Sequence, residues 1–208
     1  MFRLLDELPE ADDVEGAKEL SGAERYVELN DVHFGYLENK EIIHGLSLDV
    51  KKGALVAIVE PTRAGKTAIV NLLMRFYNPQ SGRILFDSED IRGLTRRSLR
   101  LNYSMVLQDT CLFNGTVYEN IAYGNETAGK EDVERVCRVC GIHDYIMTLL
   151  EGYDTVMEDD GSNISKGQKQ LMTIARAMLL ESSLLILYEA SLMWIPARKC
   201  RYRRQCGR

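Results

Sequence analysis

Residues 54–73 read ALVAIVEPTRAGKTAIVNLL, and this stretch decides the fold. Its first part, Ala54–Val59, is a short continuous apolar run, which is typical of a strand buried on both faces of a parallel sheet. A glycine-containing loop follows, and the next apolar-periodic run predicts a helix from about Lys66 to Tyr77, ended by an asparagine–proline pair. A strand, a loop and a helix in this order make half of a βαβ unit.

The loop Glu60–Thr67 gathers backbone N–H groups, an ammonium and a hydroxyl around one point. That arrangement suits a triphosphate with magnesium, because Lys66 would reach the β- and γ-phosphates and Thr67 would offer its hydroxyl to Mg²⁺. The pattern G-x-x-x-x-G-K-[ST] is incomplete, since Glu60 and Arg63 stand at common glycine positions. An ordinary strand–turn–helix with an exposed lysine explains this segment equally well.

Composition narrows the class of protein. The chain has 208 residues, of which 45% are apolar and 27% charged, and this make-up disfavours a disordered, collagen-like or disulfide-scaffold chain. The longest apolar stretch, Leu171–Leu187, is interrupted by Arg176 and Glu181 and falls short of the ~20 residues that span a bilayer. The N-terminus has no apolar signal-peptide core, so we expect a cytosolic location.

The cysteines are odd in number, five in all, which is typical of free thiols in a reducing compartment. Cys137 and Cys140 have C-x-x-C spacing inside a helical pattern that starts near Glu131. The sequence offers them no second ligand pair at zinc-finger spacing. Packed or half-exposed thiols are therefore favoured over metal or redox chemistry.

The remaining patterned segments predict a mixed α/β chain. Tyr26–Tyr36 and Leu46–Val50 alternate apolar and polar residues around a turn, which predicts antiparallel strands. The block Val117–Leu150 has a helical pattern. Three further strands are predicted, at Arg83–Phe86, Tyr103–Leu107 and Leu184–Tyr188.

A second helix start lies at Ser165–Gln168, where the serine and glutamine fit a capping box. A cap alone does not explain the order of motifs along the chain: Tyr36, GKT at 65–67, Gln108, NISKGQ at 163–168 and LLILYE at 184–189. In this order the sequence resembles the nucleotide-binding domain of ATP-binding-cassette transporters, in particular exporters of the multidrug and lipid type. The resemblance covers residues 1 to about 191 and includes NLLMRFYNPQSGRILFD (71–87) and VLQDTCLFNGTVYENIAYGN (106–125).

The resemblance implies an α/β fold, with a P-loop NTPase-like mixed sheet core, an antiparallel β subdomain and a helical subdomain. It implies ATP and Mg²⁺ as cofactors, and Tyr36 as the ring that stacks on adenine. The implied phosphate-loop residues are Arg63, Ala64, Gly65, Lys66 and Thr67. The implied signature residues, which contact the γ-phosphate bound to the opposite domain of a dimer, are Ser165, Gly167 and Gln168.

Two further positions carry the catalytic roles that the resemblance implies. Glu189 matches the general base that orients the attacking water, and Gln108 matches the glutamine that touches magnesium and that water. Thr67 and Gln108 are thus the implied metal contacts. Each role has a plainer alternative: a core tyrosine for Tyr36, a polar turn residue for Gln108 and a structural carboxylate for Glu189.

Four positions depart from the family pattern. Glu60 brings a negative charge near bound phosphate, and two like charges about 4 Å apart repel by about 1 kcal/mol even in water. Arg63 and Lys166 each replace a glycine, and Lys166 adds a cation at a helix N-terminus. Tyr188 stands where the family has the aspartate that holds magnesium through water, and a neutral phenol lacks that charge. We expect weak ATP binding and impaired hydrolysis.

The resemblance also divides the chain. We expect a linker or helix end at 1–25 that follows a membrane domain, an incomplete nucleotide-binding domain at 26–191, and a basic tail at 192–208 of unclear origin. The implied partners are a second nucleotide-binding domain, in a homo- or heterodimer, and the transmembrane domain of an exporter on the cytoplasmic side of the membrane. No nucleic-acid partner is expected. The main alternative is a non-enzymatic interaction or regulatory remnant that no longer binds nucleotide.

Overall fold

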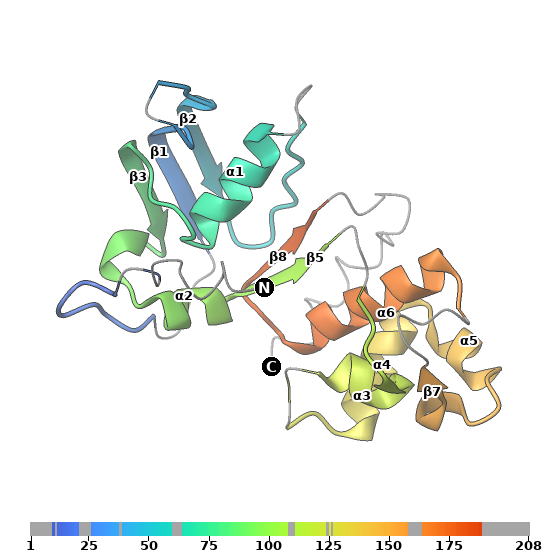
Figure 1. The fold of residues 1–208 in the computed structure, drawn as a ribbon. Coiled ribbons are helices and arrows are strands. Elements are labelled where there is room, and N and C mark those ends of the chain that lie inside the picture. Colours follow the sequence, from blue (N-terminus) through green and yellow to red (C-terminus); the bar gives the residue numbers. More distant parts are fainter. Residues whose placement is uncertain are drawn as a thin grey trace, which may run out of the picture. The chain divides into compact units, whose positions relative to one another are not determined.

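The computed structural model describes residues 10, 12–20, 26–37, 39–59, 64–107, 111–123, 125, 127–157 and 164–188. The chain divides after Asn102 into two compact units (Figure 1). The basic tail, the departing position Glu60 and the predicted site residues Arg63, Gln108 and Glu189 lie outside the described residues. Residues 10 and 12–20 are called the lead-in below.

The first unit is built on an antiparallel sheet with the strand order β2-β1-β3-β4. Its strands are β1 (Val27–Phe34), β2 (Ile43–Val50), β3 (Ser81–Phe86) and β4 (Glu89–Asp90). Its helices are α1 (Ala64–Leu73), the 3₁₀ turn η2 (Ile91–Gly93) and α2 (Arg96–Leu101). The prediction of two antiparallel strands around a turn is confirmed, because β1 and β2 pair antiparallel.

The register of this sheet shifts where β1 meets β3, between Asn30 and His33. Gly82 has a φ of 81° there, and an added Cβ would lie 2.2 Å from the carbonyl oxygen of Asp31. Only glycine avoids both the left-handed strain and the clash. Before this register shift, β1 buries Val27 and Leu29 on one face, as the alternation of apolar and polar residues in its sequence predicts.

The prediction of a buried strand over Ala54–Val59 is wrong in this structure. These six residues have no strand assignment, and Leu55 and Val59 are 79% and 91% exposed. An apolar run becomes a buried strand only where neighbouring strands pair with it and helices cover it. Within the part of the chain that the structure describes, no strand pairs with residues 54–59.

The second unit joins a short parallel sheet to a helical block. Strands β5 (Tyr103–Val106) and β8 (Leu184–Leu187) pair in parallel, and β6 (Gly115–Thr116) pairs antiparallel with β7 (Val156–Met157). The helices are α3 (Val117–Ala122), α4 (Lys130–Cys140), α5 (His143–Met147), η3 (Gly152–Asp154) and α6 (Lys166–Leu179). The predicted helical block at 117–150 is therefore confirmed.

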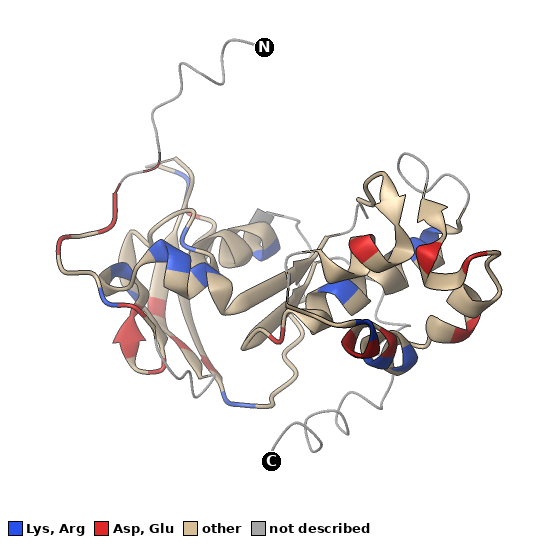
Figure 2. Ribbon diagram, turned by 90° about the horizontal axis from the view of Figure 1, so that it is seen from below, with Lys and Arg blue, Asp and Glu red and all other residues tan. Residues whose placement is uncertain are grey.

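Helix α4 shows why this block folds as it does. It buries Val133, Val136, Cys137 and Cys140 in the core of the second unit, where it contacts α6. Figure 2 shows acidic and basic residues mixed along this helix, and ion pairs join positions three and four apart. Burial raises the pKa of Cys137 to about 11, so the thiol stays protonated at neutral pH.

The interpretation of these cysteines as packed thiols is confirmed. Cys137 and Cys140 are 0% and 5% exposed, and the Cys140 Sγ lies 3.4 Å from the Met178 Sδ. The described residues contain no cluster of histidine, cysteine and carboxylate side chains arranged to hold a metal ion. Among the described helices, none has the length and apolar character needed to span a membrane.

Candidate functional site

The first turn of α1 contains Gly65, Lys66 and Thr67, as the sequence predicts. Gly65 is buried and the other two are half-buried. No acidic residue lies in this turn, so no carboxylate of the turn competes with an anion for the positive end of the helix dipole. This is the environment in which a helix N-terminus accepts a phosphate.

Tyr36 lies just beyond β1 and contacts the same helix. Its hydroxyl accepts a hydrogen bond from the Asn71 side chain of α1, with a distance of 2.9 Å between Nδ2 and Oη. Its ring meets those of Phe34 and Tyr77 edge-on, with centroids 5.0 and 5.1 Å apart. The ring is nevertheless 41% exposed. Tyr36, the predicted adenine contact, is therefore hydrogen-bonded to α1, the helix whose first turn contains the predicted phosphate-binding residues.

The predicted signature residues begin α6. Ser165 is the N-cap, its Oγ accepts from the Gln168 N–H at 3.3 Å, and the Gln168 Oε1 accepts from the Ser165 N–H at 2.9 Å. The predicted capping box is confirmed. A Cβ added to Gly167 would meet nothing within 4 Å, so packing inside the described chain does not require glycine there.

Two predicted catalytic positions follow the ends of the parallel strands β5 and β8. Val106 is the register partner of Leu187, and the Tyr188 N–H continues the pairing with a 2.9 Å hydrogen bond to the Val106 carbonyl. Both strands thus end at the same edge of the sheet. Gln108 and Glu189 come two residues after these ends in the sequence and lie outside the described residues.

These residues fall in both units. Tyr36 and the GKT turn belong to the first unit, and the signature turn and the two strand ends belong to the second. Within the first unit the structure brings Tyr36 to α1, and within the second it brings the ends of β5 and β8 together.

Sequence reasoning missed Arg176, a cation on α6 that lies against two aromatic rings. Its guanidinium carbon lies 5.5 and 5.7 Å from the ring centroids of Phe113 and Tyr123. The side chain donates to the Asn120 and Cys111 carbonyl oxygens at 2.6 and 3.1 Å. Burial lowers the pKa of Arg176. These contacts join α6 to residues 53 to 65 positions earlier in the chain, so no local sequence pattern indicates them.

The comparison with protein families decides the assignment, since the family model described as ABC transporter matches residues 43–191. The chain belongs to the ABC transporter family. It is 48% identical over 191 residues to the "Fatty acid ABC transporter ATP-binding/permease protein" of Mycobacterium bovis, covering 92% of this chain and 30% of that protein. It is 43% identical, over 92% of its length, to the "ATM1-type heavy metal exporter" of Novosphingobium aromaticivorans, of which it covers 31%.

A solved structure of this family agrees with the fold. The structure titled "Structure of a bacterial Atm1-family ABC exporter with ATP bound" matches with a TM-score of 0.83 and 40% identity, over 99% of this chain and 36% of that one. The predicted mixed α/β fold of an ABC-type ATP-binding domain is thereby confirmed. The chain spans about a third of the length of the curated relatives named above.

Proposed function

We propose that this chain is the ATP-binding domain of an exporter, which binds ATP with Mg²⁺ and is impaired in hydrolysis. The observation that carries the proposal is the position of Lys66 and Thr67 in the first turn of α1, in a chain of this family. Lys66 would neutralise the β- and γ-phosphates and Thr67 would hold the metal, while bound Mg²⁺ offsets charge that develops on the transferred phosphoryl group. Tyr36 would cover the adenine ring.

A second nucleotide-binding domain completes the site in this proposal. Ser165, Gly167 and Gln168 would contact the γ-phosphate of ATP bound to the opposite domain. Two features support this role: the residues stand at the N-terminus of a 14-residue helix, and the space beside Gly167 is open. A phosphate of a partner domain could approach the backbone closely at such a turn. Lys166 stands in place of a glycine, and its side chain takes up part of the space through which that phosphate would approach the backbone.

Impaired hydrolysis follows from the residues around the reacting phosphate. Glu189 would orient the attacking water and Gln108 would touch it, but Tyr188 supplies no negative charge to hold magnesium. The Tyr188 backbone sits at the end of β8 beside the end of β5, where an aspartate of the family would serve the metal. Glu60 adds repulsion against phosphate. Arg63 replaces a glycine but offers a compensating cation.

The membrane side of the proposal comes from the relatives. One relative is named an ATP-binding/permease protein and another is named an exporter. We propose that this domain likewise works with a transmembrane domain, on the cytoplasmic side of the membrane, and that 1–25 is the linker toward it. The incomplete domain over 26–191 and the tail over 192–208 stay predictions.

The decisive test is equilibrium titration of the purified chain with a fluorescent ATP analogue. We expect saturable binding that is lost in Lys66→Ala and kept in Lys130→Ala, which removes the same charge from the exposed start of α4. Absence of saturable binding to the unaltered chain would instead favour the remnant that no longer binds nucleotide.

Hydrolysis needs a separate measurement. Magnesium-dependent phosphate release should be close to background in the unaltered chain. Robust turnover that disappears in Glu189→Gln would show that the catalytic machinery is intact and that the proposed impairment is wrong.

A further inference from the structure

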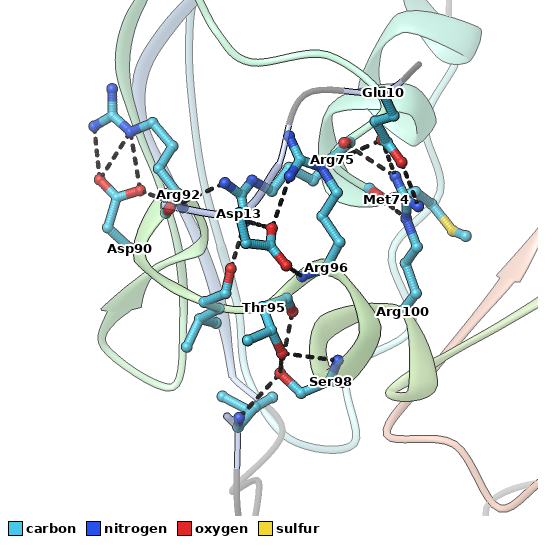
Figure 3. Close-up of polar contacts among 12 residues, drawn as sticks. Glu10, Asp13, Met74, Arg75, Asp90, Arg92, Thr95, Arg96, Ser98 and Arg100 are labelled. Carbon is cyan, nitrogen blue, oxygen red and sulfur yellow. Dashed lines mark hydrogen bonds and ion pairs between the residues drawn. The ribbon is translucent and has the colours of Figure 1, made fainter. Parts of the chain in front are cut away.

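A buried arginine lies just beyond the C-terminal end of α1, at the opposite end of the helix from the predicted phosphate turn (Figure 3). The Arg75 side chain is 3% exposed, and its backbone has a φ of 54°. Its guanidinium donates to the carbonyl oxygens of Leu94 and Arg92. Burial lowers the pKa of Arg75. A cation in this position needs a paired negative charge, because an unpaired buried charge is costly.

The negative charge comes from the lead-in, 62 to 90 positions away in the sequence. Asp13 Oδ1 accepts from Arg75 at 3.2 Å and from Arg96 at 2.7 Å, and Asp13 Oδ2 accepts from the Arg96 backbone N–H at 3.0 Å. Glu10 accepts two hydrogen bonds from Arg100, at 2.5 and 3.0 Å. Two carboxylates therefore hold three arginines, one just after α1 and two in α2.

Arg100 connects this ion-pair cluster to the turn that directly follows α1. Its Nε donates to the Met74 carbonyl at 3.0 Å and its Nη2 to the Arg75 carbonyl at 3.3 Å. The same guanidinium lies 4.6 Å from the centroid of the Phe76 ring. A cation at the carbonyl end of a helix complements its dipole. Because Glu10 orients this guanidinium, removal of Glu10 frees the group that binds the last carbonyls after α1.

Charge and backbone hydrogen bonds, rather than apolar burial, hold the lead-in. None of its described residues is buried, and Val14 is 54% exposed. The Lys18 N–H donates to the Gly93 carbonyl and the Lys18 carbonyl accepts from the Thr95 N–H, each at 2.9 Å. Salt screens the Glu10–Arg100 pair, whose side chains are 46% and 27% exposed, more strongly than the bonds of Asp13 to Arg75 and Arg96, whose side chains are 3% and 13% exposed. Rising ionic strength should therefore weaken the attachment first at Glu10, which it would not do to an apolar contact.

We infer that the lead-in is a charge-held clamp on the C-terminal end of α1. A displacement of the chain before residue 12 that pulls Glu10 and Asp13 away releases Arg75 and Arg100, and with them the end of the helix. Since the first turn of α1 carries Lys66, the clamp also regulates phosphate binding. That last link rests on the proposed function, whereas the clamp itself does not.

Hydrogen exchange measured by mass spectrometry on the full chain tests the clamp. In the double variant Glu10→Gln/Asp13→Asn, we expect amides of the lead-in and of residues 74–76 to exchange at least about tenfold faster, since charged hydrogen bonds are lost. The matched control is Asp12→Asn/Glu15→Gln, which removes two exposed charges of the same segment. It should exchange like the unaltered chain.

A salt series on the unaltered chain gives the same answer without a substitution. Raising KCl from low salt to ~1 M, where the Debye length falls to about 3 Å, should speed exchange in the lead-in. The double variant should respond much less. The clamp would be overturned if the exchange rates of the lead-in changed with neither salt nor substitution. It would also be overturned if the lead-in exchanged faster while the exchange rates of residues 74–76 stayed the same.

Titration with the fluorescent ATP analogue separates the two proposals. We expect the double variant to bind the analogue several-fold more weakly than the control. If the unaltered chain does not bind it, the proposed function fails while the exchange data still decide on the clamp. If exchange responds and affinity does not, regulation of phosphate binding is overturned and the clamp remains.

Discussion

The buried Asn120 of α3 is a single side chain on which a whole loop depends, and replacing it with alanine should destabilise the second unit strongly. It is 0% exposed. Its Nδ2 donates to the Phe113 and Thr116 carbonyls at 2.9 and 3.1 Å, and its Oδ1 accepts from the Phe113 N–H at 3.0 Å. A fourth bond, at 3.2 Å, comes from Arg176.

The size of the effect follows from these four bonds. A net hydrogen bond contributes about 0.5–1.5 kcal/mol, and partners left unsatisfied in a buried site cost more. Asn120→Ala should therefore lower the free energy of unfolding by roughly 2–4 kcal/mol. For a unit of about 100 residues, 1 kcal/mol corresponds to about 4–8 °C in Tm, so a loss of about 2 kcal/mol or more should lower the Tm of the unit by at least about 8 °C.

The assay is urea unfolding followed by circular dichroism, together with hydrogen exchange over residues 111–116. The matched control is Asn114→Ala, an exposed asparagine of the same loop, which should change stability by less than about 0.5 kcal/mol. Asn120→Asp should also destabilise, because an acceptor would then face the Phe113 and Thr116 carbonyls. A loss below about 1 kcal/mol in Asn120→Ala would refute the assignment of these bonds as structural.

Three further outcomes are expected. Ser165→Ala removes the cap of α6 and should cost about 1 kcal/mol in the free energy of unfolding, with faster exchange in its first turn; Ser165→Asp should recover most of it. Glu41 raises the pKa of His33, so their contact stabilises fully below the pKa of unfolded histidine and is lost as pH rises through the folded value. The urea midpoint difference between the unaltered chain and Glu41→Gln should therefore shrink as pH rises. Under native conditions a thiol reagent should label the exposed Cys111 quickly and the buried Cys137 only after unfolding.

Each of these three predictions would be contradicted by a specific result. Equal exchange at the start of α6 with and without the serine would mean that the capping hydrogen bonds do not hold that turn. A midpoint difference that grows with pH would have the wrong sign for a histidine paired with a carboxylate. Equal labelling rates for the two cysteines in peptide mapping would contradict the burial of α4.

Local patterns carried most of the correct predictions. The strands β1 and β2 are joined by a short turn, so alternation of apolar residues was enough to predict both strands and their antiparallel pairing. The cap of α6 was readable because Ser165 and Gln168 satisfy each other within one turn. The helical pattern that starts near Glu131 predicted α4, and the lack of a second ligand pair indicated packed thiols for Cys137 and Cys140.

Long-range pairing explains what the sequence did not reveal. Residues 54–59 have the composition of a buried strand, yet burial depends on strands supplied from elsewhere, which composition does not encode. The predicted helix to Tyr77 ends at Leu73 instead, because Arg75 takes a left-handed conformation while its side chain binds carbonyls 17 and 19 positions away. An arginine inside the apolar-looking run LLMRFY gave no local sign of that role.

The two ends of α1 are thus governed by charges of different origin. Ten residues make a helix that is marginal by itself, so its position depends on what binds its ends. At the N-terminus, the positive end of the helix dipole and the Lys66 cation favour an anion; at the other end, Arg100 binds the carbonyls of Met74 and Arg75. An anion bound at the first turn and a cation bound beyond the last both stabilise the same dipole. Loss of the carboxylate that orients Arg100 therefore weakens the helix that an incoming phosphate would need.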